Sequence, residues 1–463
     1  MTDFLADLRA VLPAVAVRTD PDSLAPRLLD QRQRYQGAAQ ALVLPASAEE
    51  AAAVLAVCRH HRVAVVPQAG NTGLVGGATP PYEGRSIVLA CDRLDRIRHI
   101  DPVGYTMTAE AGCILDHLHD AASQHDRLFP LWLGSSGSAR LGGLLSTNAG
   151  GLQVLRYGNA RELCLGIEAV LPDGRLYHGL HPLRKRNVGY DLKQWLIGAE
   201  GTLGFITAAT LRLWPRPQGR ATALVALDDL SAVLKLFQAA KAQLGEVLSA
   251  FELIGAAALC QTAMQRPDCV RPFDPPPPWA ALLEVSGGET DAVLEERLGE
   301  LLTAGGWTEA VLASSLAQAE ALWTLREAIP DAQRRAGPSI KHDISLPLDR
   351  LAEFVALACA RLATALPEAQ PVVFGHIGDG NLHFNLSLPR EAVDRFDALE
   401  AHANELVFEL TRACGGDISA EHGIGRLRRE QADRWLDPVE RGLMRQIKAC
   451  FDPDGLMNPG VLL

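Results

Sequence analysis

Two histidines lie on either side of an Asp-Gly pair in an apolar segment. The segment reads VVFGHIGDGNLHFNLSL from Val372 to Leu388, and Asp-Gly between two apolar runs is typical of a two-residue hairpin turn. With Asp379-Gly380 as the turn, His376 would face His383 with Cβ atoms ~5 Å apart. Two imidazoles at that spacing can hold one metal ion, or they can be ordinary polar side chains on an exposed strand face.

A carboxylate and a third histidine follow in SAEHGIG, where Glu421 and His422 are adjacent between glycines. Two histidines and one glutamate leave a coordination position open, which is typical of a catalytic metal site. We therefore predict a metal site of His376, His383 and Glu421. Zn²⁺ suits these donors best, and Mn²⁺ or Co²⁺ could also serve.

Glycine-rich segments occur three times in the N-terminal half: 67–77 (PQAGNTGLVGG), 134–151 and 198–204 (GAEGTLG). Glycine allows a ligand to approach the backbone closely, and successive amides can hold a diphosphate. One such loop alone is more often a surface turn, but three are costly for folding and indicate contact with a large flat cofactor. None is the Gly-x-Gly-x-x-Gly or Walker A pattern, which disfavours the usual nicotinamide fold.

Together these motifs resemble the FAD-linked D-2-hydroxy-acid dehydrogenase branch of the vanillyl-alcohol oxidase / p-cresol methylhydroxylase flavoproteins, with the D-2-hydroxyglutarate enzymes nearest. The segments that carry the resemblance are VVPQAGNTGLVGG, LLSTNAGGLQVLRYGN, GYDLKQWLIGAEGTLG, FGHIGDGNLHFN, SAEHGIG and MNPG. The resemblance implies an α+β fold. It would comprise a PCMH-type FAD-binding domain of two α+β subdomains, an antiparallel-sheet substrate (cap) domain and a helical C-terminal segment.

The resemblance also implies FAD bound without a covalent bond, because the first loop offers no His or Cys to link the flavin. It places cofactor-binding residues in all three glycine-rich segments and near the C-terminus. These are Pro67, Gly70, Asn71, Thr72, Gly73, Leu74, Gly77, Gly134, Ser135, Ser138, Gly142, Gly143, Thr147, Asn148, Gly150, Glu200, Gly201, Gly204, Ile206 and Asn458.

The implied reaction is metal-assisted oxidation of a D-2-hydroxy acid to the 2-oxo acid, with hydride passing to flavin N5. His422 matches the family's catalytic base, and Arg326, Lys341 and Asn385 match its substrate-binding residues. Pro330 stands where the hydroxyglutarate enzymes have Thr, so D-lactate and D-malate stay open as substrates. A metal-dependent hydrolase and a non-catalytic flavin-binding protein are the alternatives from other classes. The expected electron acceptor is an electron-transfer flavoprotein or a quinone, and a homodimer is compatible with the sequence.

Composition bears on the possible partners of the protein and on its location in the cell. The net charge is −11 with 44 Lys+Arg, and no concentrated basic face suggests nucleic acid. The 9 cysteines are scattered without a Cys-x-x-Cys pair, which fits a reducing compartment. The N-terminus lacks the pattern of a signal peptide, and no apolar run is long enough to span a membrane. We therefore expect a cytoplasmic protein.

The elements that must position these residues divide the 463-residue chain into three parts. We predict an FAD-binding domain at 1–218, a substrate-binding cap at 219–414 and a C-terminal segment at 415–463 that completes the active site and packs on the FAD domain. The pattern Ser47-Ala48-Glu49-Glu50 predicts a helix start, with the helix running to about His61.

Overall fold

The computed structural model describes residues 3–463, which form two compact units. The first unit contains the chain up to Gly150, Gly158–Arg216 and His422–Leu463. The second contains Gly151–Tyr157 and Pro217–Glu421. The domain boundaries at 218 and 414 that the sequence suggested stay predictions.

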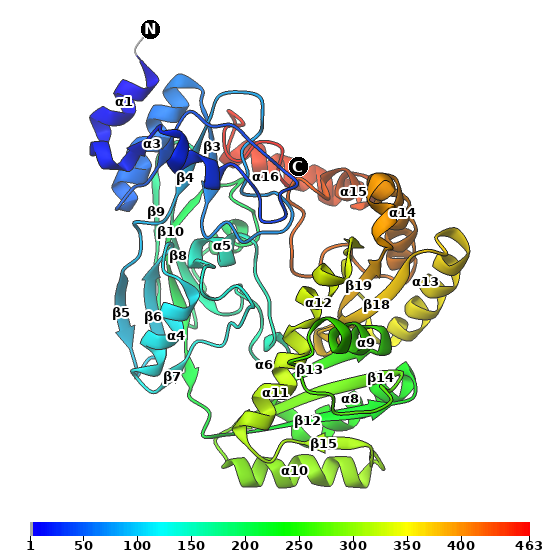
Figure 1. Cartoon of the computed structure of the whole chain (residues 1–463). Helices are drawn as coiled ribbons and strands as arrows, with labels where there is room; N and C mark the ends of the chain where they lie inside the picture. The colour runs from blue at the N-terminus through cyan, green and yellow to red at the C-terminus, as the bar shows by residue number, and fades with distance from the viewer. Residues whose placement is uncertain (1–2) are drawn as a thin grey trace. The chain divides into compact units, whose positions relative to one another are not determined.

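The first unit is built on two larger sheets and a two-stranded sheet of β7 and β11 (Figure 1). A small sheet has the strand order β1-β2-β4-β3, and an antiparallel sheet has the order β5-β6-β10-β8-β9. Its strands are β1 (Val17–Arg18), β2 (Leu42–Val43), β3 (Ala64–Gln68), β4 (Ser86–Ala90), β5 (Ile97–Asp101), β6 (Thr106–Glu110), β7 (Arg127–Leu128), β8 (Cys164–Val170), β9 (Leu176–Gly179), β10 (Phe205–Arg212) and β11 (Trp214–Pro215). Its helices are α1 (Phe4–Val11), α2 (Pro21–Leu24), α3 (Ala48–His61), α4 (Leu115–Ser123), α5 (Leu141–Ser146), α7 (Lys193–Leu196), α15 (Arg429–Trp435) and α16 (Pro438–Phe451).

Helix α3 begins as its sequence predicts. Ser47 is the N-cap, and its side chain accepts a hydrogen bond from the backbone N–H of Glu50 at 3.2 Å, which satisfies a donor that the first turn leaves unpaired. The helix ends at His61 because Arg62 turns left-handed, with φ 52°. Strand β3 continues through Pro67 to Gln68.

The second unit has an antiparallel sheet with the order β15-β12-β14-β13-β18-β19-β16, and β17 also pairs with β19. Its strands are β12 (Gly219–Leu227), β13 (Leu248–Gly255), β14 (Trp279–Gly287), β15 (Ala310–Leu312), β16 (Ser339–Ile340), β17 (Asp343–Ser345), β18 (Gln370–Gly375) and β19 (Asn381–Ser387). Its helices are α6 (Val154–Tyr157), α8 (Leu230–Leu244), α9 (Ala256–Gln265), α10 (Asp291–Ala304), α11 (Leu316–Glu327), α12 (Ile329–Ala336), α13 (Leu351–Ala365) and α14 (Phe396–Ala413).

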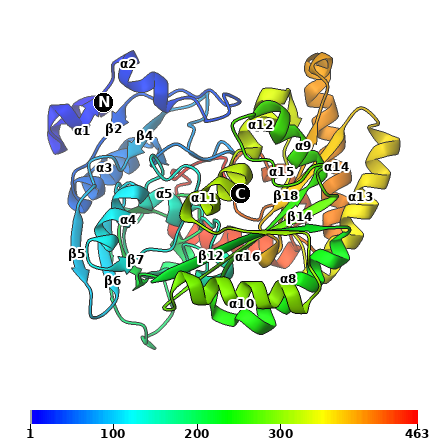
Figure 2. The ribbon, with the colours of Figure 1, turned by 60° about the horizontal axis from the view of Figure 1, so that its bottom comes forward.

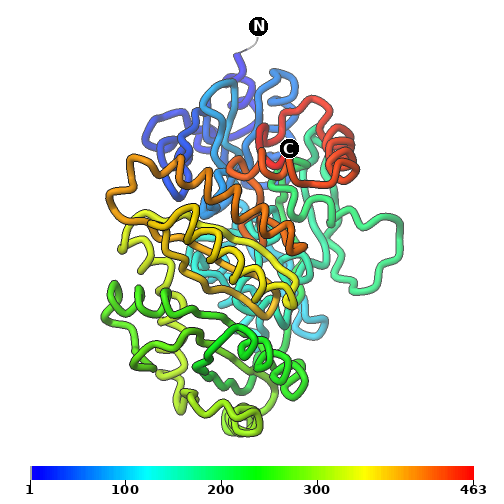
Figure 3. The backbone as a smooth tube through the Cα atoms, turned by 90° about the vertical axis from the view of Figure 1, so that its right-hand side faces the viewer, coloured from blue at the N-terminus to red at the C-terminus, as the bar shows by residue number. Residues whose placement is uncertain are grey.

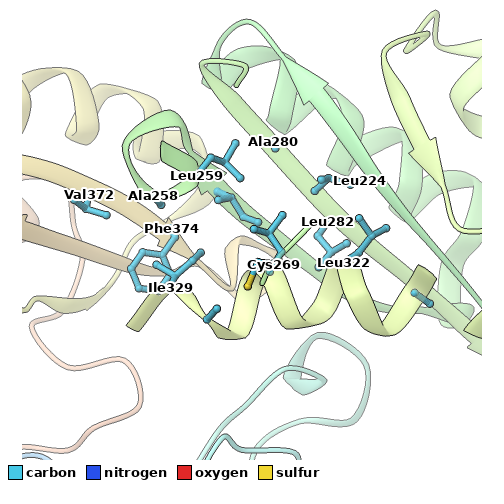
Figure 4. Close-up of a cluster of buried hydrophobic side chains, with 14 of the residues drawn as sticks. Leu224, Ala258, Leu259, Cys269, Ala280, Leu282, Leu322, Ile329, Val372 and Phe374 are labelled. Atoms are coloured by element: carbon cyan, nitrogen blue, oxygen red, sulfur yellow. The ribbon is translucent and has the colours of Figure 1, made fainter. Parts of the chain in front are cut away.

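Helices cover both faces of this sheet because its strands are apolar on both sides. Helices α8 and α10 lie along one face (Figure 2), where Phe237 packs edge-on against Phe251. On the other face, α9, α11 and α12 bury a cluster that includes Leu282, Leu322 and Phe374 (Figure 4). Helices α13 and α14 run side by side (Figure 3). Helix α11 therefore packs on the same sheet that contains the β18–β19 hairpin.

Candidate active site

The β18–β19 hairpin differs from the predicted one in its turn. Phe374, and not His376, stands opposite His383, because residues Ile377–Asp379 form a turn of 3-10 helix between the strands. Gly380 closes that turn with φ 84°, and a Cβ there would meet Leu346 O at 2.5 Å. The expected two-residue turn at Asp379-Gly380 is therefore wrong, and His376 lies in the loop and not on a strand.

The loop nevertheless brings His376 to the other two predicted metal ligands. One ligand atom from each of His376, His383 and Glu421 lies within 4.8 Å of the others. The two imidazole rings are 5.5 Å apart between centroids, and His383 Nε2 is 3.7 Å from Glu421 Oε1. Both histidines are buried. Two buried nitrogen donors and one partly exposed oxygen donor fit the preferences of Zn²⁺.

Glu252, in the middle of β13, contacts His376, one of the three candidate metal ligands. Its Oε1 lies 2.7 Å from His376 Nδ1, and its Oε2 accepts a hydrogen bond from Arg326 Nε at 2.8 Å. The Glu252 side chain is only 1% exposed. Sequence reasoning missed it, although a carboxylate within the apolar run LSAFELIG is itself a signal, since a buried charge requires partners.

Asp343 on β17 plays a similar part for Glu421. Its Oδ2 accepts a hydrogen bond from the backbone N–H of Glu421 at 3.1 Å, and its Oδ1 accepts one from Asn381 Nδ2 at 2.9 Å. Asp343 also pairs with His383 across the strands. This carboxylate, which the sequence analysis also missed, ties the backbone of one candidate ligand to the strand that carries another.

The charges of the cluster shift its proton equilibria. Burial disfavours the imidazolium of His376, but the Glu252 carboxylate outweighs burial and raises the pKa of His376 to about 9. Burial raises the pKa of Glu421, while His376 opposes that rise. Without an ion the cluster therefore holds protons that a metal would have to displace.

The three predicted substrate residues all lie in the second unit. Arg326, near the end of α11, is buried against Glu252. Lys341 is half-buried between β16 and β17. Asn385 on β19 is buried, and its Nδ2 donates to Gln333 Oε1 at 2.8 Å while its Oδ1 accepts from the backbone N–H of His342. Their role in binding substrate stays a prediction.

In the first unit, the glycine-rich segments approach one another closely. A Cβ at Gly70 would lie 2.1 Å from Ser138 O, and one at Gly143 would lie 3.0 Å from Ala69 Cβ. Gly201 packs on Pro67 with φ 72°. These contacts require glycine and bring the three predicted cofactor segments together.

The remaining predicted cofactor residues fall on the same segments, with two differences from the expected loops. Gly142 and Gly143 lie in the short helix α5 and Ile206 lies in β10, so these three do not belong to open loops. The other residues lie outside the named helices: Asn71, Thr72, Gly73, Leu74 and Gly77 after β3, Gly134, Ser135 and Ser138 before α5, Thr147, Asn148 and Gly150 after it, and Gly204 before β10. Asn71 and Asn148 have positive φ.

The C-terminal segment is fastened to these glycine-rich segments by two side chains. Asn458 Nδ2 donates to Gly77 O and Glu200 O at 2.9 and 2.7 Å. The Glu200 carboxylate accepts the backbone N–H groups of Ile424 and Gly425, both at 2.8 Å. Glu200, expected to contact FAD, thus uses its carboxylate on the loop that follows His422.

Two family descriptions match this chain. "FAD linked oxidases, C-terminal domain" covers residues 216–462, and "FAD binding domain" covers residues 39–179. The chain belongs to the FAD-linked oxidases. It is therefore an FAD-dependent oxidoreductase, and the flavin expected from the glycine-rich segments is confirmed.

Relatives and solved structures agree with this family. The chain is 38% identical to "D-2-hydroxyglutarate dehydrogenase, mitochondrial" of Bos taurus over 469 residues, covering 100% of this chain and 83% of the relative. It is 36% identical to "Putative D-lactate dehydrogenase C713.03, mitochondrial" of Schizosaccharomyces pombe, covering 95% and 85%. The structure of p-cresol methylhydroxylase with substrate bound has a TM-score of 0.79 at 16% identity, covering 99% of this chain and 95% of that one. The PCMH-type α+β fold of this FAD-linked oxidase is thus confirmed.

The expected cytoplasmic location is contradicted, because both of these relatives of the FAD-linked oxidase are named as mitochondrial. Free thiols indicate only a reducing environment, and all nine cysteines of the chain are free, so thiols could not distinguish one reducing compartment from another. Within residues 3–463, none of the helices has the length and hydropathy needed to cross a bilayer.

Proposed function

We propose that this FAD-linked oxidase oxidises D-2-hydroxyglutarate to the 2-oxo acid with the help of a divalent metal held by His376, His383 and Glu421. The observation that carries the proposal is the convergence of these three donors, two of which are buried histidines. The name and 38% identity of the Bos taurus relative support the substrate. When bound, FAD would take up the hydride from substrate C2, and a metal held by His376, His383 and Glu421 would acidify the substrate hydroxyl as metals do bound water.

The chain's own residues have distinct tasks in this proposal. His422, next to the ligand Glu421 in sequence, takes the hydroxyl proton as general base. Arg326 presents a planar guanidinium to a substrate carboxylate, and Lys341 adds a second positive charge. Glu252 Oε2 accepts from Arg326 Nε and lies 2.8 Å from Nη2 as well, so the guanidinium N–H groups that point away from Glu252 are the ones to bind substrate. Asn385, a buried polar residue on β19, is the third residue proposed to bind the substrate.

A second substrate is favoured by a specific observation. The Schizosaccharomyces pombe relative is named a putative D-lactate dehydrogenase at 36% identity, and Pro330 removes the hydroxyl that a Thr would offer near Arg326. D-lactate lacks the distal carboxylate of D-2-hydroxyglutarate, so a site for it would depend less on Lys341. An electron-transfer flavoprotein or a quinone is the proposed acceptor for reduced FAD.

Anaerobic flavin reduction tests the function directly. D-2-hydroxyglutarate should bleach the flavin absorbance, while its L-enantiomer should not. D-lactate and D-malate should bleach it more slowly at equal concentration. Protein stripped of metal should stay yellow but reduce slowly, with recovery on adding Zn²⁺, Mn²⁺ or Co²⁺. Equal rates after metal removal is verified would refute the metal, and no bleaching by any D-2-hydroxy acid would refute the substrate class.

A further inference from the structure

Two glutamates on one face of the second unit's sheet receive side chains from the same helix. Glu252 on β13 and Glu284 on β14 are both buried. Helix α11 reaches Glu252 with Arg326 and Glu284 with Trp323, whose Nε1 donates at 2.9 Å. The two carboxylates therefore have the same scaffold, but only Glu252 extends the contact further, to His376.

The two carboxylate oxygens of Glu252 have different partners, and this arrangement determines which ring nitrogen of His376 carries a proton. Since Arg326 engages Oε2, Oε1 is the oxygen that faces His376 Nδ1 at 2.7 Å. An ionised carboxylate can only accept hydrogen bonds, so Nδ1 must carry a proton. The other ring nitrogen, Nε2, is then the one with a lone pair for a metal. Metal-binding histidines usually have such an outer partner, which sets both the tautomer and the orientation of the ring.

We propose that Glu252 is a positioning residue that holds His376 with Nδ1 protonated and presents Nε2 to the metal, while the same carboxylate orients Arg326. This inference rests on the proposed metal site and deepens it. One buried anion thereby couples a candidate metal ligand to a candidate substrate anchor, although Glu252 and His376 are 124 residues apart in the chain.

The isosteric variant Glu252→Gln separates this role from simple packing. Glutamine has one oxygen and one NH₂ group, so it can satisfy Arg326 through the oxygen only by turning NH₂ toward His376. That NH₂ group would require an unprotonated Nδ1, and the proton would move to Nε2, the metal-binding atom. Glu284→Gln is the matched control, because it changes the same residue type on the same face without contact to His376.

Zinc affinity is the readout, measured by competition with a chromophoric chelator at pH 9, where protons compete least for the imidazole. The wild-type protein should hold one equivalent of Zn²⁺. Glu252→Gln should bind it roughly 10- to 100-fold more weakly, with flavin content unchanged, while Glu284→Gln should stay within about twofold of wild type. Equal affinity in Glu252→Gln would overturn the positioning role. A wild-type protein that binds no zinc would instead refute the metal site itself.

A folding defect in Glu252→Gln would arise from leaving Arg326 buried without an anion. The double variant Glu252→Leu/Arg326→Met removes that charge and leaves His376 Nδ1 without an acceptor, since neither new side chain can accept a hydrogen bond from it, and it should restore the circular dichroism spectrum and flavin content. Its zinc affinity should remain as low as that of Glu252→Gln. Recovery of wild-type affinity in the double variant would show that the lost metal binding came from the stranded arginine, and would overturn the inference.

Discussion

The proton on His376 gives the metal site a steep dependence on pH. Because Glu252 raises the pKa of His376 to about 9, the folded, metal-free protein holds an imidazolium at neutral pH. Only about 1% of the molecules then have a neutral His376 at pH 7, against about half at pH 9. Since a metal binds only the neutral ring, the apparent Kd for Zn²⁺ should fall roughly 50-fold between pH 7 and 9, or ~2.3 kcal/mol.

The same shift acts on the stability of the metal-free protein. The pKa of His376 is higher in the folded protein than the ordinary value of ~6.5, so protonation of His376 stabilises the fold. This stabilisation is complete below pH ~6.5 and is lost as the pH rises through about 9. The thermal midpoint of the metal-free protein should therefore fall over this range. The increase in midpoint caused by added Zn²⁺ should grow over the same range, because binding no longer displaces a proton.

Chelator competition at several pH values measures the affinity, and calorimetry in buffers of different ionisation enthalpy counts the released protons. We expect about one proton per metal at pH 7 from His376, and more if Glu421 is also protonated. Glu252→Gln should flatten the profile, because it removes the anion that raises the pKa. An imidazole with a pKa of ~6.5 would change the affinity less than twofold between pH 7 and 9, so a flat wild-type profile would refute the reasoning.

Three further predictions test the catalytic loop, its support and the hairpin turn. His422→Ala should keep the flavin absorbance but slow its reduction by D-2-hydroxyglutarate about 10²- to 10⁴-fold; normal reduction would exclude His422 as the base. Glu200→Gln should turn an NH₂ group toward one of two backbone donors and lower the stability of the fold by ~1–3 kcal/mol. Hydrogen exchange of the backbone amides at 424–425 should become faster, and unchanged exchange would contradict this role of Glu200. Gly380→Ala should lower stability by at least ~1–2 kcal/mol, because it strains a positive φ and meets Leu346 O at 2.5 Å. Gly299→Ala, in open space within α10, should be neutral or stabilising by comparison.

The local elements were predictable because their signals lie within a few residues of one another. The Ser47 cap and the following helix follow from the sequence, as does an apolar hairpin around Asp379-Gly380. The exact turn did not follow, because Asp-Gly is equally compatible with a 3-10 turn that ends at a left-handed glycine. The pairing moved by two residues, from His376 to Phe374 opposite His383. His376 lies in the loop and not on a strand, so its closeness to His383, 5.5 Å between ring centroids, comes from the conformation of the loop and not from strand pairing.

The supporting carboxylates could not be assigned from the sequence, because their roles depend on distant partners. Glu252 and Asp343 act on residues 124 and 78 positions away. The apolar run around Glu252 indicates that its charge must be paired but not with what. For Glu200 the sequence predicts contact with the flavin, which stays a prediction, but it did not indicate that the carboxylate accepts two backbone N–H groups of the C-terminal loop. A sequence motif can indicate that a residue has a specific role, but the groups that its side chain contacts are seen only in the folded structure.

The contrast between Glu252 and Glu284 shows how one scaffold produces two kinds of carboxylate. Burial raises the pKa of both groups. His376 and Arg326 outweigh burial at Glu252 and lower its pKa, whereas Trp323 and Arg220 only partly offset burial at Glu284, whose pKa stays raised. A tryptophan N–H donates a hydrogen bond but carries no charge, so it satisfies an oxygen without stabilising a full anion as an arginine does. His376 and the two side chains one turn apart on α11 thus make the anion more favourable at Glu252 than at Glu284. That charge lies where it can hold a histidine in the state that a metal requires, which is why Glu252 and not Glu284 should control zinc binding.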